Sequence, residues 1–296
     1  MKTVSIIGIG RVGGALALAL DRKGYKLQTL ISRNRQKVKK ISEKLKSEPK
    51  VLTHIDSDKT AGEIIFITTQ DAEIENVAGK FAENRTGDNK FVFHTSGSLS
   101  SEVLKILTAK NYLIGSIHPL ISVSDPVLGA DNFGNAYFCI EGDPEAVQTA
   151  EKIIADLAGK SFTVKTEYKT LYHAAAVTAC GHLVALIQTS LEMLAGCGLD
   201  AEKSKKILLP LINSTVSNIN GQALADALTG TFARGDYKTL GRHIESIKNE
   251  LPPEILQIYL LLGEKSLELA EQQNAKPENL AEMAKIISLA KRDSKC

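Results

Sequence analysis

The chain has 296 residues, which suits two domains better than one, because single domains usually hold about 100 to 200 residues. An apolar fraction of 43% and a charged fraction of 24% are typical of globular proteins and exclude a disordered or fibrous chain. The net charge of +2, the aromatic fraction of 5% and the absence of tryptophan argue against a phosphate-neutralising or base-stacking surface. We therefore expect no nucleic-acid partner.

The sequence shows no clear signal peptide, membrane-spanning segment or metal-binding motif. Met-Lys-Thr is followed at once by an apolar strand and not by a secretory signal. The longest apolar run, Ala174 to Ile187, is interrupted by Gly181 and His182 and is too short to span a bilayer. The cysteines form no Cys-x-x-Cys pair, which favours reduced thiols without a metal: Cys139, Cys180, Cys197 and Cys296. We expect a cytoplasmic protein that binds no membrane and no metal.

Short apolar strands alternate with helices over residues 1–165, and this alternation predicts a Rossmann-type, mostly parallel sheet. The predicted strands are Val4 to Ile7, Lys26 to Ile31, Ile64 to Thr68, Phe91 to Phe93, Tyr112 to Ile117, Ala136 to Glu141 and Ser161 to Val164. The predicted helices are Val12 to Arg22, Gln36 to Lys46, Glu73 to Asn84, Ser100 to Lys110 and Glu145 to Ala158.

Residues 166–296 carry helical periodicity without comparable strand signals, so we predict a second, all-helical domain. Its expected helices are Tyr172 to Cys197, Lys203 to Asn220, Lys238 to Ile247, Pro253 to Asn274 and Pro277 to Lys291.

A glycine-rich loop, Gly8-Ile9-Gly10-Arg11-Val12-Gly13, follows the first strand and opens the first helix. In this context Gly8 permits a tight turn, Gly10 admits a pyrophosphate and Gly13 allows helix and strand to pack closely. We expect the backbone of this loop, with Arg11 and Val12, to bind a dinucleotide on the helix N-terminus. The alternative is a strand–helix turn that binds nothing.

The second strand ends in Ile31-Ser32-Arg33-Asn34-Arg35, where an NAD enzyme would place a carboxylate on the ribose. Ser32, Arg33 and Arg35 instead suit a 2′-phosphate, which favours NADP(H). The alternative is that these arginines belong to a solvated basic face that continues through Lys37. Thr68 and Thr69 end another strand at the same edge and are expected to touch the cofactor.

Two histidines also follow strands at this edge, in His94-Thr95-Ser96-Gly97 and in Ser116-Ile117-His118-Pro119. Imidazole suits proton transfer near neutral pH, and reduction of a carbonyl requires a proton for the resulting oxyanion. The residues alone leave open which histidine acts and whether each only caps its loop.

The helical domain offers three further candidates for substrate contact. Tyr172 and His173 begin a helix just past the domain junction, and Arg234 lies in a turn-rich loop. Arg234 could clamp a substrate carboxylate or could only pair with Asp236 to stabilise the turn.

Several motifs together resemble the Rossmann-like NADP oxidoreductases with a helical C-terminal domain of unknown function, relatives of pyrroline-5-carboxylate reductase and of deazaflavin-dependent NADP reductases. The resemblance rests on these segments: Gly8 to Gly13, His94 to Gly97, Ser116 to Leu120, Tyr172 to Ala175, Leu209 to Leu211 with Asn218, and Leu228 to Asp236. It implies an oxidoreductase that acts as a homodimer.

Ser96 followed by His118-Pro119 is also similar to prephenate dehydrogenases and 3-hydroxyacyl-CoA dehydrogenases, whose histidine at that place handles the substrate hydroxyl proton. The resemblance implies that His118 is the catalytic histidine. We expect Ser96 to act with it in catalysis as an orienting hydroxyl, and we expect the substrate to be bound by His94, Tyr172, His173 and Arg234. Cys180-Gly181 stands where the family usually has Ser-Asn.

These observations predict an NADP(H)-dependent oxidoreductase that transfers a hydride to or from a small carbonyl, imine or hydroxy-acid substrate. The rival hypothesis is a catalytically inactive NADP(H)-sensing binding protein, since Cys180-Gly181 departs from the family pattern.

Overall fold

The computed structural model describes residues 2–56, 60–83, 87–273 and 275–293. Contacts divide the chain into two compact units, 1–181 and 182–296, with the boundary inside helix α6 (Lys169–Gly196). The sequence placed the domain boundary at residue 165, whereas the first half of α6 belongs to the first unit. Asn84, Asn274 and Cys296, which the sequence analysis used, lie outside the described residues.

The first unit contains one eight-stranded sheet in the order β3-β2-β1-β4-β5-β6-β7-β8. Its strands are β1 (Thr3–Ile7), β2 (Lys26–Ile31), β3 (Lys50–Leu52), β4 (Ile64–Ile67), β5 (Phe91–His94), β6 (Leu113–Pro119), β7 (Tyr137–Gly142) and β8 (Lys160–Thr163). All neighbouring strands are parallel except β6 and β7. The predicted Rossmann-type, mostly parallel sheet is therefore confirmed, and a separate helical region follows it.

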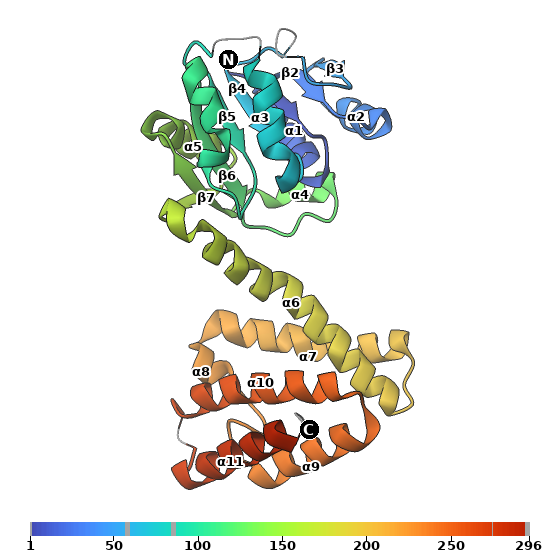
Figure 1. Ribbon diagram of the computed structural model, residues 1–296. Coiled ribbons are helices and arrows are strands. Elements are labelled where there is room, and N and C mark those ends of the chain that lie inside the picture. The colour runs from blue at the N-terminus through green and yellow to red at the C-terminus, as the bar shows by residue number, and fades with distance from the viewer. Residues whose placement is uncertain (1, 57–59, 84–86, 274, 294–296) are drawn as a thin grey trace. The chain divides into compact units, whose positions relative to one another are not determined.

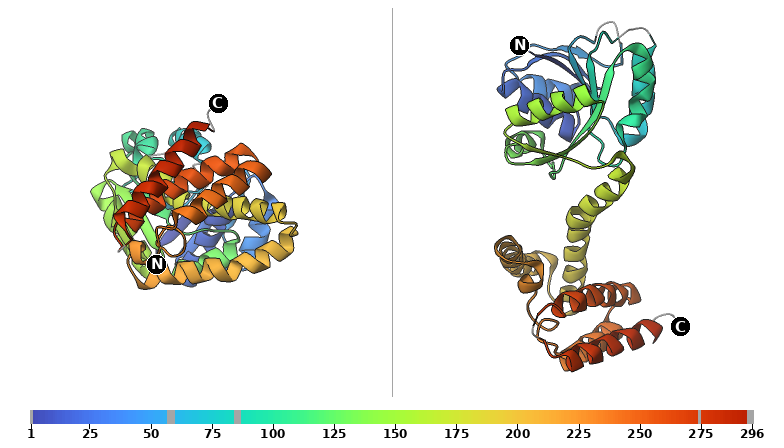
Figure 2. Two further views of the ribbon diagram at one scale, coloured as in Figure 1. Left: turned by 90° about the horizontal axis from the view of Figure 1, so that it is seen from below. Right: turned by 90° about the vertical axis from the view of Figure 1, so that its left-hand side faces the viewer.

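Helices cover both faces of this sheet, as expected when strands are buried on both sides (Figures 1 and 2). One apolar cluster joins Val4 and Ile6 of β1 to the helices of one face, and a second joins Ile65 and Ile67 of β4 to those of the other. The first face carries α1 (Arg11–Arg22), α2 (Arg35–Ser42), α4 (Pro126–Asn132) and α5 (Pro144–Asp156). The second carries α3 (Asp71–Ala82) and the 3₁₀ helix η1 (Ser101–Lys110).

Two short elements within residues 1–165 were not predicted. Strand β3 has three residues and carries an exposed Val51, so its sequence lacks the buried alternation by which strands are found. Helix α4 has seven residues, and Asp125 caps its first turn by accepting from the backbone N–H groups of Val127 and Leu128. Pairing with β2 forms β3, and the Asp125 cap begins α4, so neither element depends on a pattern of apolar residues that the sequence would reveal.

The second unit is helical, and its core lies where α9, α10 and α11 pack together (Figure 1). Leu240, Leu260 and Met283 are fully buried there, one from each helix. The described helices are the C-terminal half of α6, α7 (Ala201–Gly221), α8 (Leu224–Ala227), α9 (Tyr237–Glu250), α10 (Pro253–Ala270) and α11 (Pro277–Asp293). A 3₁₀ turn, η2 (Thr166–Tyr168), precedes α6.

One helical stretch, Thr166–Gly196, is long and apolar enough by length and composition to cross a membrane. Its best window has a mean hydropathy of 1.5, and 6% of that window is buried. This is a weak indication, because an apolar helix that packs against protein passes the same test. Most of the apolar surface of α6 is exposed, and a proposal for the function must say what covers it.

Candidate functional site

A cleft of about 520 Å³ opens at the carboxyl ends of β1, β2 and β4. The chain builds the sheet outward on one side of β1 and then continues on the other side with β4, so the strand order reverses here. Ligands of open α/β sheets bind at such a switch point. The residues that line the cleft include Gly8, Ile9, Gly10, Ser32, Arg33, Asn34, Lys37, Thr68, Thr69 and Gln70.

The glycine loop has the geometry of a phosphate-binding turn. Gly8 has φ +103°, a conformation that side chains disfavour, and a Cβ there would lie 2.8 Å from the Thr68 carbonyl carbon. A Cβ on Gly13 would collide with the carbonyl oxygen of Gly8. A Cβ on Gly10, by contrast, would meet no atom within 4 Å. Gly8 and Gly13 are thus needed for the fold, whereas Gly10 leaves open space for a ligand.

The N-terminus of α1 adds donors to this open space. Gly10 precedes the helix without a side-chain capping bond, so the first backbone N–H groups have no intrahelical partner. Arg11 is exposed and Val12 is half-buried at the first two helical positions. These free donors and the positive end of the helix dipole suit a pyrophosphate.

The basic groups at the end of β2 differ in detail from those predicted. Ser32 and Arg33 line the cleft, whereas Arg35 is the exposed first residue of α2 and is not among the described lining residues. Lys37 takes its place in the lining, because the Asn34 side chain accepts from the Lys37 N–H at 3.0 Å and so begins α2 there. From the sequence, Lys37 was expected only in the alternative, as part of a solvated basic face.

The end of β4 offers one unsatisfied polar atom to the cleft. Thr68 donates through its hydroxyl to the carbonyl of Gly8 and thereby ties β4 to the glycine loop. The hydroxyl oxygen of Thr69 is buried and, among the described residues, has no hydrogen-bond partner. A buried polar group is normally paired, so Thr69 fits a bound polar ligand such as the ribose or amide of a dinucleotide.

The loop after β5 is held by its own polar side chains. His94 is fully buried, and its Nδ1 accepts from the Ser96 N–H at 3.1 Å while its Nε2 lies 3.1 Å from the Ser100 carbonyl. The Ser96 hydroxyl donates to Asp71 at 2.8 Å and accepts from the N–H groups of Ser98 and Leu99. Both side chains thus shape the loop, and the expected roles of His94 and Ser96 toward a substrate stay predictions.

His118 lies in a second cluster beside that loop. Its Nδ1 is 2.8 Å from the Tyr172 hydroxyl, and its ring stands edge-on to the His173 ring with centroids 5.6 Å apart. A Cβ on Gly97 would lie 2.7 Å from Nε2 of His118 and would also meet Nδ1 of His173. Nδ1 of His173 is buried and has no partner among the described residues. The absent side chain of Gly97 thus lets both imidazoles pack closely against the backbone of the loop.

The surroundings of His118 and His94 keep both imidazole rings neutral. Burial, the His173 ring and the Lys169 ammonium lower the pKa of His118 to about 4, against a weaker opposite effect of Asp71. Burial and Lys169 lower the pKa of His94 to about 4 as well. Burial raises the pKa of the Tyr172 hydroxyl, which therefore keeps its proton and can donate it to Nδ1 of His118. The neutral imidazole of His118 then carries its own proton on Nε2.

Sequence reasoning missed two residues that the fold places next to this cluster, Lys169 and Glu141. Glu141 faces Ser116 across β6 and β7, and Lys169 reaches both from the first turn of α6. A charged residue inside an apolar strand, as Glu141 is in β7, is the signal that could have pointed to them.

Arg234 belongs to the second unit, where it is exposed in the turn before α9. The Asp236 carboxylate caps α9 by accepting from the Thr239 N–H at 3.0 Å, and nearby Arg234 contributes a smaller share to the lowered pKa of that carboxyl. Its contact with a substrate stays a prediction.

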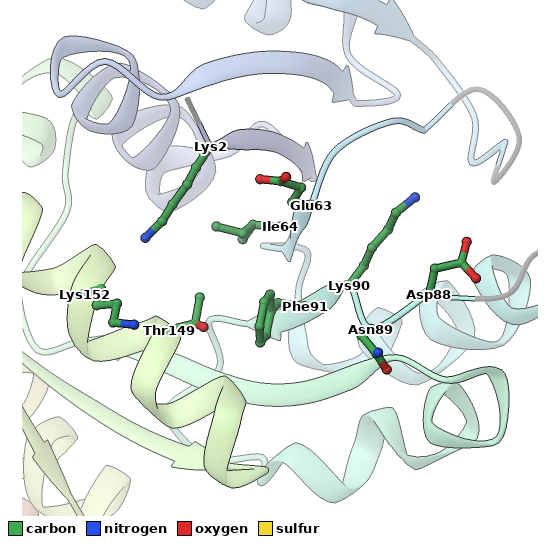
Figure 3. A pocket seen from close by; sticks show the side chains of 9 residues that line it. All are labelled: Lys2, Glu63, Ile64, Asp88, Asn89, Lys90, Phe91, Thr149 and Lys152. Carbon is green, nitrogen blue, oxygen red and sulfur yellow. The ribbon is translucent and has the colours of Figure 1, made fainter.

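A second hollow, of about 400 Å³, lies at the opposite, amino-terminal edge of the sheet (Figure 3). Its floor is made by Ile64 and Phe91, and the side chains of Lys2 and Lys152 lie along one side. Among the described residues that line it there is no histidine or cysteine, so it offers no group that exchanges protons near neutral pH. The carboxyl edge is therefore the candidate site. No group of three or more metal-ligating side chains gathers in the described ranges.

Comparison with known families agrees with this architecture. Residues 1–119 match the Rossmann-like domain, and residues 136–266 match the domain of unknown function DUF2520. The chain is a Rossmann-like protein with a DUF2520 domain. The resemblance inferred from the sequence motifs is thereby confirmed. No curated protein matches the sequence at a significant level.

Solved structures share the fold of this Rossmann–DUF2520 protein over most of its length. Protein TM1727 from Thermotoga maritima is 25% identical, with a TM-score of 0.71, and the match covers 91% of this chain and 98% of that one. BF3122 from Bacteroides fragilis, described as an NADP oxidoreductase, is 22% identical with a TM-score of 0.71 and coverage of 90% and 98%. A Plasmodium falciparum pyrroline carboxylate reductase with NADP bound is 13% identical with a TM-score of 0.58 and coverage of 95% and 98%.

Proposed function

We propose that this Rossmann–DUF2520 protein is an NADP(H)-dependent oxidoreductase that transfers a hydride to or from a small carbonyl, imine or hydroxy-acid substrate. The observation that carries the proposal is the cleft at the carboxyl ends of β1, β2 and β4, where Gly10 leaves open space and the buried Thr69 hydroxyl has no partner among the described residues. The loop that carries Gly97 and packs against His118 adjoins the dinucleotide cleft, because Asp71 directly follows the cleft residues Thr69 and Gln70 and binds the Ser96 and Ser98 hydroxyls. The NADP-linked structural neighbours support the same cofactor class.

The residues of the cleft fit a nicotinamide dinucleotide, which would supply or accept the hydride. The free N–H groups at the start of α1 would bind the pyrophosphate, with Gly10 leaving room for it. Arg33 and Lys37 would bind a 2′-phosphate, and the unpaired Thr69 hydroxyl would accept or donate a bond near the ribose or amide.

His118 would exchange the proton that the substrate oxygen or nitrogen gains or loses. With Tyr172 donating to Nδ1, Nε2 is the ring nitrogen left to exchange a proton with the substrate. Proton transfer from a positioned imidazole typically contributes about 10² to 10⁴ in rate. His173 would bind a second polar group of the substrate through its unpaired Nδ1.

A substrate screen tests the function directly. Purified protein with NADPH or NADP⁺ is offered a panel of small aldehydes, ketones, cyclic imines and hydroxy acids, and the nicotinamide absorbance is followed. We expect turnover with at least one class. Tight NADPH binding without any turnover would instead favour the inactive sensing protein.

Cofactor choice is the first specific prediction. The Arg33→Ala, Lys37→Ala double variant should weaken NADPH binding by about 1 to 3 kcal/mol while leaving NADH binding nearly unchanged, since only NADPH carries the 2′-phosphate. Isothermal titration calorimetry measures both. Arg35→Ala is the matched control, because Arg35 is exposed outside the described lining, and it should have the smaller effect. Equal losses for the two cofactors would refute the assignment.

We further propose that the exposed apolar surface of α6 and α7 is covered by a second copy of the chain. Val184 on α6 is 66% exposed and Leu211 on α7 is 64% exposed, and both helices carry further exposed large apolar side chains. Exposed apolar surface of this kind marks an interaction site.

The homodimer is tested by sedimentation. Leu211→Lys with Val184→Lys should convert a dimer to a monomer, whereas Ile106→Lys, at an exposed apolar residue of η1, should leave the dimer intact. A wild-type protein that is monomeric in solution but binds lipid vesicles would show that a membrane covers this surface.

A further inference from the structure

A buried ion pair lies on the same face of the sheet as His118. Lys169 Nζ is 2.9 Å from Glu141 Oε1, and the two side chains are 1% and 6% exposed. Lys169 also donates to the Ser116 hydroxyl, and the Glu141 carboxylate accepts from the Ser101 N–H at 2.8 Å and the Ser101 hydroxyl at 2.7 Å. Burying two charges costs desolvation free energy that a packed apolar pair would not. Stability alone therefore does not explain the pair.

The pair is connected to His118 by the register of the sheet and by the helix period. Ser116 and His118 are two residues apart on β6, so their side chains share one face, where they lie opposite Glu141 and Cys139 of β7. Lys169, Tyr172 and His173 occupy positions i, i+3 and i+4 of α6 and so share one face of the helix. The face of α6 that Lys169 fixes to the sheet is therefore the face that presents Tyr172 and His173 to His118.

We infer that Lys169 is a positioning residue for the proposed reaction: anchored to Glu141 and Ser116, it holds the first turn of α6 so that the Tyr172 hydroxyl stays on Nδ1 of His118 and Nε2 is the nitrogen that meets the substrate. The inference rests on the proposed function. The distance that carries it is the 2.8 Å contact between Tyr172 and His118, one turn along the helix from the buried ammonium.

The positive charge of Lys169, like its position, favours a neutral His118 ring with its proton on Nε2. The groups that face His118 are Lys169, Tyr172 and His173 from α6, Asp71 from the start of α3, and Cys139 from β7. The ammonium disfavours a second positive charge nearby, and Asp71 opposes it more weakly. Lys169 therefore favours a neutral imidazole, the only form in which Tyr172 can fix which ring nitrogen carries the proton.

The test uses nuclear magnetic resonance of the full chain with isotope-labelled histidine, in which the His118 signals report both the titration and the protonated nitrogen. The double variant Lys169→Met, Glu141→Gln removes both charges and so avoids leaving one buried charge unpaired. We expect it to bind NADPH as the wild type does, to raise the pKa of His118 by about one unit, a tenfold change in acid constant, and to lose the preference for a proton on Nε2. Turnover of whichever substrate is found should fall at least about tenfold.

Two further variants complete the design. Tyr172→Phe leaves the ion pair intact and should abolish the Nε2 preference as well. The exposed pair Lys265–Glu268 on α10, 2.7 Å apart, supplies the control variant Lys265→Met, Glu268→Gln, which should leave the His118 signals unchanged.

The inference is overturned if the folded double variant keeps the wild-type titration and protonated nitrogen, which is the result expected from a merely structural ion pair. It is also overturned if Tyr172→Phe leaves the nitrogen preference unchanged, because Lys169 is inferred to act through the Tyr172 contact, and this arm can refute the inference even if the double variant does not fold. The His118 titration and its protonated nitrogen are measured without a substrate. A wild-type protein without turnover would therefore refute the proposed function, while these two measurements would still test the effect of Lys169 on His118.

Discussion

His118→Gln should lower the turnover of the substrate by about 10² to 10⁴ while leaving NADPH affinity nearly unchanged. The physical reason is that glutamine cannot exchange a proton at neutral pH, whereas His118 is not among the described residues that line the dinucleotide cleft. Steady-state kinetics and calorimetric titration with NADPH measure the two quantities separately.

His94→Gln is the matched control for this result. His94 is fully buried and both of its ring nitrogens have partners in the loop, so the substitution should lower the free energy of unfolding by about 1 to 3 kcal/mol through the loss of buried hydrogen bonds. Residual turnover should follow the amount of folded protein. A His118 variant with full turnover, or one whose only defect is lost stability, would show that His118 is a structural residue.

Gly10→Val should abolish dinucleotide binding without lowering the melting temperature. A Cβ at Gly10 would meet no atom of the rest of the protein within 4 Å, so we expect the fold to accept it, but the side chain would fill the space through which a pyrophosphate approaches the N-terminus of α1. Calorimetry with NADPH and a thermal melt of the same sample measure the two effects.

Gly13→Val provides the contrast, because its side chain would collide with the Gly8 carbonyl and the Thr68 hydroxyl. This variant should unfold at a much lower temperature or fail to fold. Retained NADPH binding in Gly10→Val would show that the phosphate lies elsewhere.

The sequence by itself determined the parts of this protein that are made by neighbouring residues. The strand and helix alternation predicted the Rossmann-type sheet, since each βαβ unit carries its own apolar pattern. The spacing of Gly8, Gly10 and Gly13 predicted the turn between β1 and α1, because that turn is built by six contiguous residues whose backbone conformation depends on the absence of side chains. The lack of a carboxylate after the second strand, where Ser32 and Arg33 stand instead, likewise predicted a site for a 2′-phosphate.

Tertiary structure decided which of the candidate side chains are free to act. His94 and His118 both follow or end strands at one sheet edge, and their sequences gave no reason to prefer one on chemistry alone. Loop 95–100 folds back on His94 and occupies both of its nitrogens, whereas α6 supplies Tyr172 to only one nitrogen of His118. Lys169 and Glu141 are 28 residues apart and meet only because the antiparallel β7 and the start of α6 lie together. Contacts of this kind depend on strand register and helix placement, which set the direction of each side chain and which no local pattern encodes.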